Sequence, residues 1–100
     1  MRRNDVLARL KETEPALRAA GVGALYLFGS HARDEAGLDS DIDVFVDPAP
    51  EKEFGFLPFM KAYEALQEAF DHSIDVGYST RAGLSPYIRS DVEREALRIF

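Results

Sequence analysis

Residues 40–46, Ser-Asp-Ile-Asp-Val-Phe-Val, constrain the fold of this chain more than any other stretch. Aspartates that alternate with β-branched and aromatic residues predict a buried β-strand. Because side chains on a strand alternate between two faces, we expect Asp41, Asp43 and Phe45 on one face and the aliphatic residues on the other. The two carboxylates would lie about 6 to 7 Å apart along the strand. Such a buried pair is costly without a counter-charge, and Mg²⁺, which prefers a few carboxylates plus substrate phosphates, would supply one.

A second signal lies upstream, where residues 25–33 read Leu-Tyr-Leu-Phe-Gly-Ser-His-Ala-Arg. The apolar run predicts a strand over residues 24–28, followed by a short helix over residues 30–35. Gly29 would let the backbone approach a ligand closely, and Ser30 would cap the helix or bind a phosphate oxygen. Free N–H groups at a helix start favour anions, and Arg33 could reach the same anion. This junction therefore predicts a phosphate-binding site.

A third carboxylate, Asp75, lies in the apolar run Ser-Ile-Asp-Val-Gly-Tyr at residues 73–78, which predicts another strand. If that strand lies beside the strand of Asp43, the three aspartates form one cluster. Three carboxylates can hold two Mg²⁺ ions about 4 Å apart, an arrangement that serves phosphoryl and nucleotidyl transfer.

Composition limits the class of protein. The 100 residues suit one domain, residues 1–100, and the absence of cysteine excludes disulfides and thiolate zinc sites. The net charge of −6 argues against direct nucleic-acid binding, which draws on clustered Lys and Arg. No apolar stretch reaches transmembrane length and no signal-peptide core is present, so we expect a cytoplasmic protein that does not bind membranes.

The rest of the chain alternates helical and strand-like patterns, which predicts an α/β arrangement of helices against a small sheet. Helices are expected from Asn4 to Gly21 with a break at Pro15, along residues 59–70, and from Ser85 onward, and a loop over residues 36–40. The last helix would bury one apolar stripe, made of Ile88, Val92, Ala96 and Ile99. Large apolar residues over 54–60 would be core or an exposed docking patch. The patterns leave strand order open.

The spacing of the two principal motifs resembles a known signature. Gly29-Ser30, ten intervening residues (31–40) and then Asp41-Ile42-Asp43 are similar to the pattern of the DNA polymerase β-like nucleotidyltransferase superfamily. The chain most resembles the minimal nucleotidyltransferase (MNT) proteins of prokaryotes, over nearly its whole length. This resemblance implies a nucleotidyltransferase palm fold, α+β in class, with a small mixed sheet flanked by helices.

The resemblance also implies roles for individual residues. Asp41 and Asp43 would bind two Mg²⁺ ions, and Asp75 would assist one metal and act as, or position, a general base. Gly29 and Ser30 would hold the triphosphate of ATP, with Arg33 in support. From the residues alone, Arg33 is as compatible with a surface ion pair to Asp34 or Glu35, and Asp75 with a structural pairing.

Many MNT proteins are antitoxins paired with a HEPN-family ribonuclease toxin, and the resemblance implies that role here. Such an antitoxin transfers AMP from ATP to a tyrosine of the toxin and silences it. Two alternatives stay open. The chain could be a catalytically idle antitoxin that masks its partner sterically, or a nucleotidyltransferase with a small-molecule acceptor.

Overall fold

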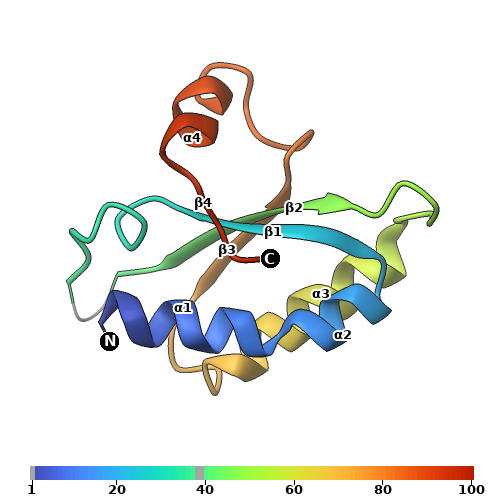
Figure 1. Ribbon diagram of the computed structural model, residues 1–100, viewed down its shortest axis with the longest axis horizontal. Helices are drawn as coiled ribbons and strands as arrows, with labels where there is room; N and C mark the ends of the chain where they lie inside the picture. The colour runs from blue at the N-terminus through green and yellow to red at the C-terminus, as the bar shows by residue number, and fades with distance from the viewer. Residues whose placement is uncertain (1, 38–39) are drawn as a thin grey trace.

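The computed structural model describes residues 2–37 and 40–100, and Figure 1 shows its helices and strands. In chain order these are α1 (Arg3–Glu12), α2 (Glu14–Ala19), β1 (Val22–Phe28), β2 (Ile42–Pro48), α3 (Phe56–Ala69), β3 (Val76–Thr80), α4 (Arg89–Glu95) and β4 (Leu97–Arg98). The strands form one sheet in the order β3-β2-β1-β4. Strand β1 is antiparallel to β2 and β4, whereas β2 and β3 are parallel. The expected small mixed sheet flanked by helices is therefore confirmed.

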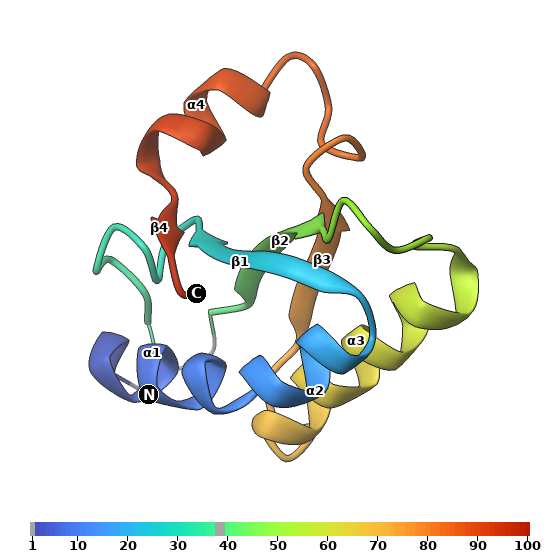
Figure 2. The same ribbon diagram turned by 45° about the vertical axis from the view of Figure 1, so that its right-hand side comes forward.

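The sheet is covered unequally on its two faces. Helices α1, α2 and α3 lie together beneath it, whereas α4 stands alone on the opposite side (Figures 1 and 2). The longest helix, α3, connects β2 to its parallel neighbour β3, as a parallel pair requires. Three helices thus cover one face of the sheet, and α4 covers only part of the other face.

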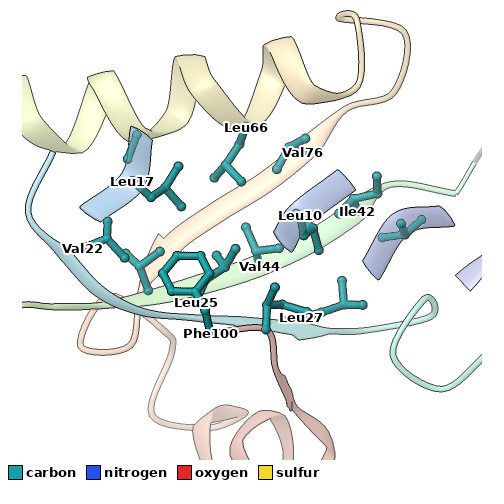
Figure 3. Close-up of a cluster of buried hydrophobic side chains, with 14 of the residues drawn as sticks. Leu10, Leu17, Val22, Leu25, Leu27, Ile42, Val44, Leu66, Val76 and Phe100 are labelled. Atoms are coloured by element: carbon teal, nitrogen blue, oxygen red, sulfur yellow. The ribbon is translucent and has the colours of Figure 1, made fainter. Parts of the chain in front are cut away.

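The main core fills the layer between the sheet and α1–α3 (Figure 3). Ile42, Val44 and Val46 of β2 all point into it and are fully buried. Its other fully buried members include Val6, Leu10, Leu17, Leu25, Leu27, Leu66 and Phe70. Because the three β2 residues share this face, the residues between them must face α4.

A smaller cluster on the α4 side confirms that alternation. Phe45 is fully buried there against Leu84 and Val92, and the rings of Tyr26 and Phe28 pack on it. This cluster fixes α4 and the segment before it over one end of the sheet. The face that carries Phe45 also carries Asp43, so the predicted carboxylate lies beside an apolar cluster rather than in open solvent.

Several predicted elements differ from the structure. The short helix expected over residues 30–35 is only a hydrogen-bonded turn over residues 30–34. The helix expected from Ser85 begins at Arg89, because residues 85–88 form a turn, and it ends at Glu95. The predicted stripe was wrong at its ends: Ile88 is 48% exposed, and Ile99 joins the main core after the unpredicted strand β4.

The apolar run at residues 54–60 has two characters. Phe59 is half-buried and stacks on Tyr78 with ring centroids 4.5 Å apart, and Phe54 contacts Phe59 edge-on. Phe56 and Leu57, at the first turn of α3, are exposed.

The loop expected at residues 36–40 lies partly outside the described residues, at positions 38 and 39. Within residues 2–37 and 40–100, every helix is too short or too polar to cross a lipid bilayer.

Candidate functional site

Asp43 is the second residue of β2 and lies in the middle of the sheet. Its neighbours in register are Phe28 on β1 and Gly77 on β3. Since Ile42 and Val44 point into the main core, the Asp43 side chain points to the face that α4 only partly covers. The sheet therefore presents this carboxylate at a partly open surface.

Two glycines make room for the Asp43 carboxylate, one on each side. A β-carbon at Gly29 would lie 2.5 Å from Oδ2 of Asp43, and one at Gly77 would lie 2.6 Å from Oδ1. Both distances are far shorter than any real β-carbon contact, so a larger residue at either position would displace the carboxylate. Gly29 also has a φ of +77°, which glycine adopts most readily.

Electrostatics at Asp43 disfavour its charge. Burial raises the pKa of Asp43 above its ordinary value, and the neighbouring carboxylate of Asp41 raises it further. Charge interactions with His31 and Arg33 oppose this rise in the pKa of Asp43. A divalent cation between Asp41 and Asp43 would remove this penalty, so the site favours cation binding.

Asp41 and Asp75 lie just before the first residues of two neighbouring strands, β2 and β3. Each comes one residue before its strand, β2 or β3, and both are exposed. The parallel register pairs Ile42 with Val76, and the N–H of Ile42 donates to the carbonyl of Asp75 at 3.0 Å. The strands thus bring the two aspartates to the end of the sheet where β2 and β3 begin, next to Asp43.

These carboxylates do not form a closed metal cage. Within residues 2–37 and 40–100, no group of three or more His, Cys, Asp or Glu side chains is arranged to hold a metal ion. The donor set of Asp41 and Asp43 nevertheless fits Mg²⁺, which commonly takes one or two carboxylates and completes its shell with substrate phosphates and water. The ligand role of Asp75 stays a prediction.

The turn after β1 presents backbone donors beside Asp43. Arg33 N–H donates to the carbonyl of Gly29 at 3.1 Å, and Glu35 N–H donates to that of Ser30 at 2.9 Å. These bonds wind residues 29–35 into one helical turn. In the described part of the chain, the N–H groups of residues 30–32 have no hydrogen-bond acceptor. Such a row of unpaired donors suits an anion.

Arg33 is held by two carboxylates. Its Nε donates to Glu35 at 3.1 Å, and its Nη1 donates to both carboxylate oxygens of Glu95 at 3.1 Å. These hydrogen bonds, with Glu35 first, raise the pKa of the guanidinium above its ordinary value. The ion pair with Glu35 that the sequence allowed is present, and Glu95 is an additional partner.

The buried side chain of His31 connects the same turn to the residue before Asp41. Its ring is only 2% exposed, and Nε2 donates to the carbonyl of Ser40 at 3.2 Å. Ser40 immediately precedes Asp41, so this bond connects the turn to the start of β2.

A family model described as a nucleotidyltransferase domain matches residues 5–99. The chain belongs to the nucleotidyltransferase domain family. That match covers nearly the whole sequence, and it includes Gly29, Gly77 and all three predicted aspartates. No curated protein matches the sequence.

Solved structures agree with this family. A structure described as a candidate minimal nucleotidyltransferase is 29% identical, with a TM-score of 0.77 over 97% of this chain and 95% of that one. A toxin–antitoxin structure with AMP-PNP is 20% identical, with a TM-score of 0.64 over 100% of this chain and 73% of the other. A mutant of the toxin–antitoxin MntA-HpeT gives 18% and 0.60 over the same shares. At these lower identities the likeness concerns the fold.

Two residues of this candidate site were missed from the sequence alone. Gly77 could have been found, because a glycine inside a strand pattern often marks a close approach by another group. Glu95 carried no signal, since it acts on Gly29 and Arg33 across 66 and 62 residues of sequence.

Proposed function

We propose that this protein is an Mg²⁺-dependent adenylyltransferase that transfers AMP from ATP to a tyrosine of a HEPN-family toxin and thereby acts as its antitoxin. The observation that carries the proposal is the contact between Gly29 and Asp43. Through it, the turn suited to a phosphate touches the carboxylate suited to a metal ion. Nucleotidyl transfer needs both at the same α-phosphate.

The protein groups would divide the work as follows. The N–H groups of residues 30–32, with the Ser30 hydroxyl, would hold the triphosphate, and Arg33 would add positive charge beside it. Asp41 and Asp43 would hold Mg²⁺, which, when bound, polarises the phosphate and offsets the charge of the leaving group. Asp75, the third ligand that the resemblance implies, would assist the metal.

In the proposed reaction one bond to the α-phosphorus forms and another breaks. The tyrosine hydroxyl oxygen bonds to the α-phosphorus of ATP, and the bond from that phosphorus to the bridging oxygen of the β-phosphate breaks. Pyrophosphate leaves with the electron pair, and the hydroxyl proton passes to a carboxylate, for which Asp75 is the candidate. Its exposed position at the start of β3 leaves it accessible to an incoming acceptor.

The toxin partner is supported by the two structural neighbours described as toxin–antitoxin complexes, one of which holds AMP-PNP, an ATP analogue. It is also supported by the sequence resemblance to MNT proteins. The partner's class, the acceptor tyrosine and the choice of ATP are parts of the proposal.

The test is intact-mass spectrometry of the neighbouring gene's product after incubation with this protein, Mg²⁺ and ATP. An Asp41→Ala, Asp43→Ala variant runs in parallel, together with reactions that replace ATP by GTP, CTP or UTP. With the wild-type protein and ATP, we expect the partner's mass to increase by one or more adenylyl groups. We expect no such increase with the double variant or with GTP, CTP or UTP.

Three results would contradict the proposal. A stable complex with no mass gain, in which the double variant still neutralises the toxin, would indicate steric masking. Transfer from labelled ATP to a small hydroxylated acceptor without any protein partner would indicate a different acceptor class. An equal mass gain with the double variant would remove Asp41 and Asp43 from the reaction.

A further inference from the structure

The Glu95 carboxylate, near the other end of the chain, accepts hydrogen bonds from two donors of the glycine turn at residues 29–35. Its Oε1 accepts from the N–H of Gly29 at 3.1 Å, and both of its oxygens accept from Nη1 of Arg33 at 3.1 Å. The Glu95 side chain is 29% exposed; its bond from Gly29 is partly buried, whereas its bonds from Arg33 lie at the surface. Such charge-assisted bonds hold their donors more firmly than neutral ones.

The register of the sheet explains why Glu95 meets Gly29. Strands β1 and β4 pair Tyr26 with Arg98 and Leu27 with Leu97. Continuing this antiparallel register by two residues places Glu95 opposite Gly29. The ladder has ended there, because α4 ends at Glu95, and the Glu95 side chain supplies the acceptor that a longer β4 would have supplied from its backbone.

Glu95 itself is firmly placed. Three residues before it, Val92 packs into the cluster with Phe45 and Leu84, and two residues after it, Leu97 joins the sheet. The carboxylate is therefore fixed to the sheet on both sides, and it transmits that position to the turn.

The two donors that Glu95 holds are the two that matter for the proposed chemistry. Gly29 must stay within contact of the Asp43 carboxylate. Arg33, four residues later in the same turn, must keep a donor for the phosphate. Arg33 uses Nη1 for Glu95 and Nε for Glu35, while its Nη2 has no hydrogen-bond partner in the described part of the chain. That nitrogen is left for a phosphate.

We propose that Glu95 is a positioning residue for the nucleotide, which sets Arg33 toward the triphosphate and keeps Gly29 against Asp43. The inference rests on the proposed function, since it needs a triphosphate at this turn. Glu95 itself touches neither the nucleotide nor the metal, and it acts only through these two neighbours.

The experiment compares wild type, Glu95→Gln and Glu95→Ala by calorimetric binding of AMP-PNP with Mg²⁺ and by KM and kcat for ATP. Glu95→Ala should weaken binding and raise KM by about tenfold, because both donors are released. Glu95→Gln should stay within about threefold of wild type, since its amide oxygen still accepts from both donors. The Gly29 amide resonance should move in Glu95→Ala and hardly in Glu95→Gln, without any ligand.

The controls separate positioning from charge and from unfolding. Asp91→Asn removes the same charge from the same helix at an exposed ion pair and should leave binding unchanged. Circular dichroism checks the fold of each variant. In an Arg33→Ala background, most of the Glu95→Ala effect on AMP-PNP affinity should disappear, because the two residues act together.

Several outcomes would overturn the inference. Tighter AMP-PNP binding by Glu95→Gln would make Glu95 a competing anion, and a full additional loss in the Arg33→Ala background would uncouple the two residues. Unchanged binding by Glu95→Ala would remove any role. If wild type binds no AMP-PNP, the proposed function fails as well, whereas the other outcomes leave it intact.

Discussion

The Asp43 carboxylate lies against Gly77 in space that a side chain there would fill, since a β-carbon at Gly77 would lie 2.6 Å from Oδ1. The two residues are direct neighbours in the parallel register of β2 and β3. The atom in the way is the end of a side chain, and Gly77 has no left-handed φ. A methyl group would therefore be accommodated by moving the carboxylate, not by breaking the sheet.

Gly77→Ala should abolish most activity while the protein stays folded. A displacement of a reacting group by about 1 Å can cost on the order of 10²-fold in rate, and we expect a loss of that size in kcat for adenylyl transfer. The measurement is kcat together with a thermal melt, in which Tm should change by no more than a few degrees, about 1 kcal/mol in this size class.

Gly55→Ala is the matched control for this substitution. A β-carbon at Gly55 would have no heavy atom within 4 Å, and the residue has an ordinary φ of −82°. This variant should keep wild-type kcat. If Gly77→Ala is as active as Gly55→Ala, the position of Asp43 does not limit the reaction.

Asp43→Asn should stabilise the protein at neutral pH when no metal is present. Burial and Asp41 raise the pKa of Asp43 in the folded state, so the folded protein favours the neutral acid. Stability is therefore lost as pH rises from the ordinary pKa of 3.8 through the folded value, and a neutral amide avoids this loss. In EDTA at pH 7, Tm should rise by roughly 1 to 4 °C, and the gain should shrink as pH falls toward 4.

With Mg²⁺ and AMP-PNP present, the Tm of wild type should exceed that of Asp43→Asn. Ligands that bind the folded state alone raise its stability, and only wild type keeps both carboxylates for the metal. Asp91→Asn, at an exposed ion pair, serves as the control and should gain nothing in EDTA. A Tm gain of Asp43→Asn that is equally large at pH 4 would show that charge burial is not its cause.

The central strand was predictable because one pattern determined both of its faces. Asp43 and Phe45 alternate with Ile42, Val44 and Val46, and only one register puts the aliphatic residues in the core. The glycine turn beside Asp43 followed from the same local logic, since Gly29 ends an apolar run.

Other features depend on partners far along the chain and could not be predicted this way. The C-terminal stripe matched a helix, yet Leu97 pairs with Leu27 of β1 and takes the last residues into the sheet. The contact of Glu95 with Gly29 follows from that pairing alone. Local periodicity is blind to such long-range registers.

His31→Leu should loosen the start of β2 while keeping the core filled. The leucine preserves burial but cannot donate to the carbonyl of Ser40, which His31 reaches at 3.2 Å. Losing this bond should cost about 1 kcal/mol in the free energy of unfolding. Because Ser40 adjoins Asp41, AMP-PNP with Mg²⁺ should also bind more weakly.

Urea unfolding and calorimetry measure the two effects, and His31→Gln is the informative comparison because its amide can still donate. If leucine and glutamine at this position weaken AMP-PNP binding equally, the bond to Ser40 is not what orders Asp41.

Arg81→Met should destabilise the packing of α4 on the sheet. Arg81 donates to both oxygens of Asp47 at 2.9 Å and to Glu93 at 2.6 Å. Its guanidinium carbon also lies 4.9 Å from the ring centroids of Tyr26 and Phe45. Methionine keeps the stem but leaves two carboxylates unpaired, which should cost about 1 to 2 kcal/mol in urea unfolding, discounted for the partial exposure of the pair.

Arg94→Met is the reference variant with which the stability loss of Arg81→Met is compared. Arg94 pairs with Asp91 on the same helix, where both side chains are more than 70% exposed, and removing it should cost only a few tenths of a kcal/mol. Arg81→Lys should fall between the two, since an ammonium keeps the charge but cannot form the two-pronged contact with Asp47. Equal losses for Arg81→Met and Arg94→Met would mean that Arg81 contributes no more than a surface ion pair. In that case, the position of α4, and with it that of Glu95, would depend on the apolar cluster around Phe45 and on the pairing of β4 with β1.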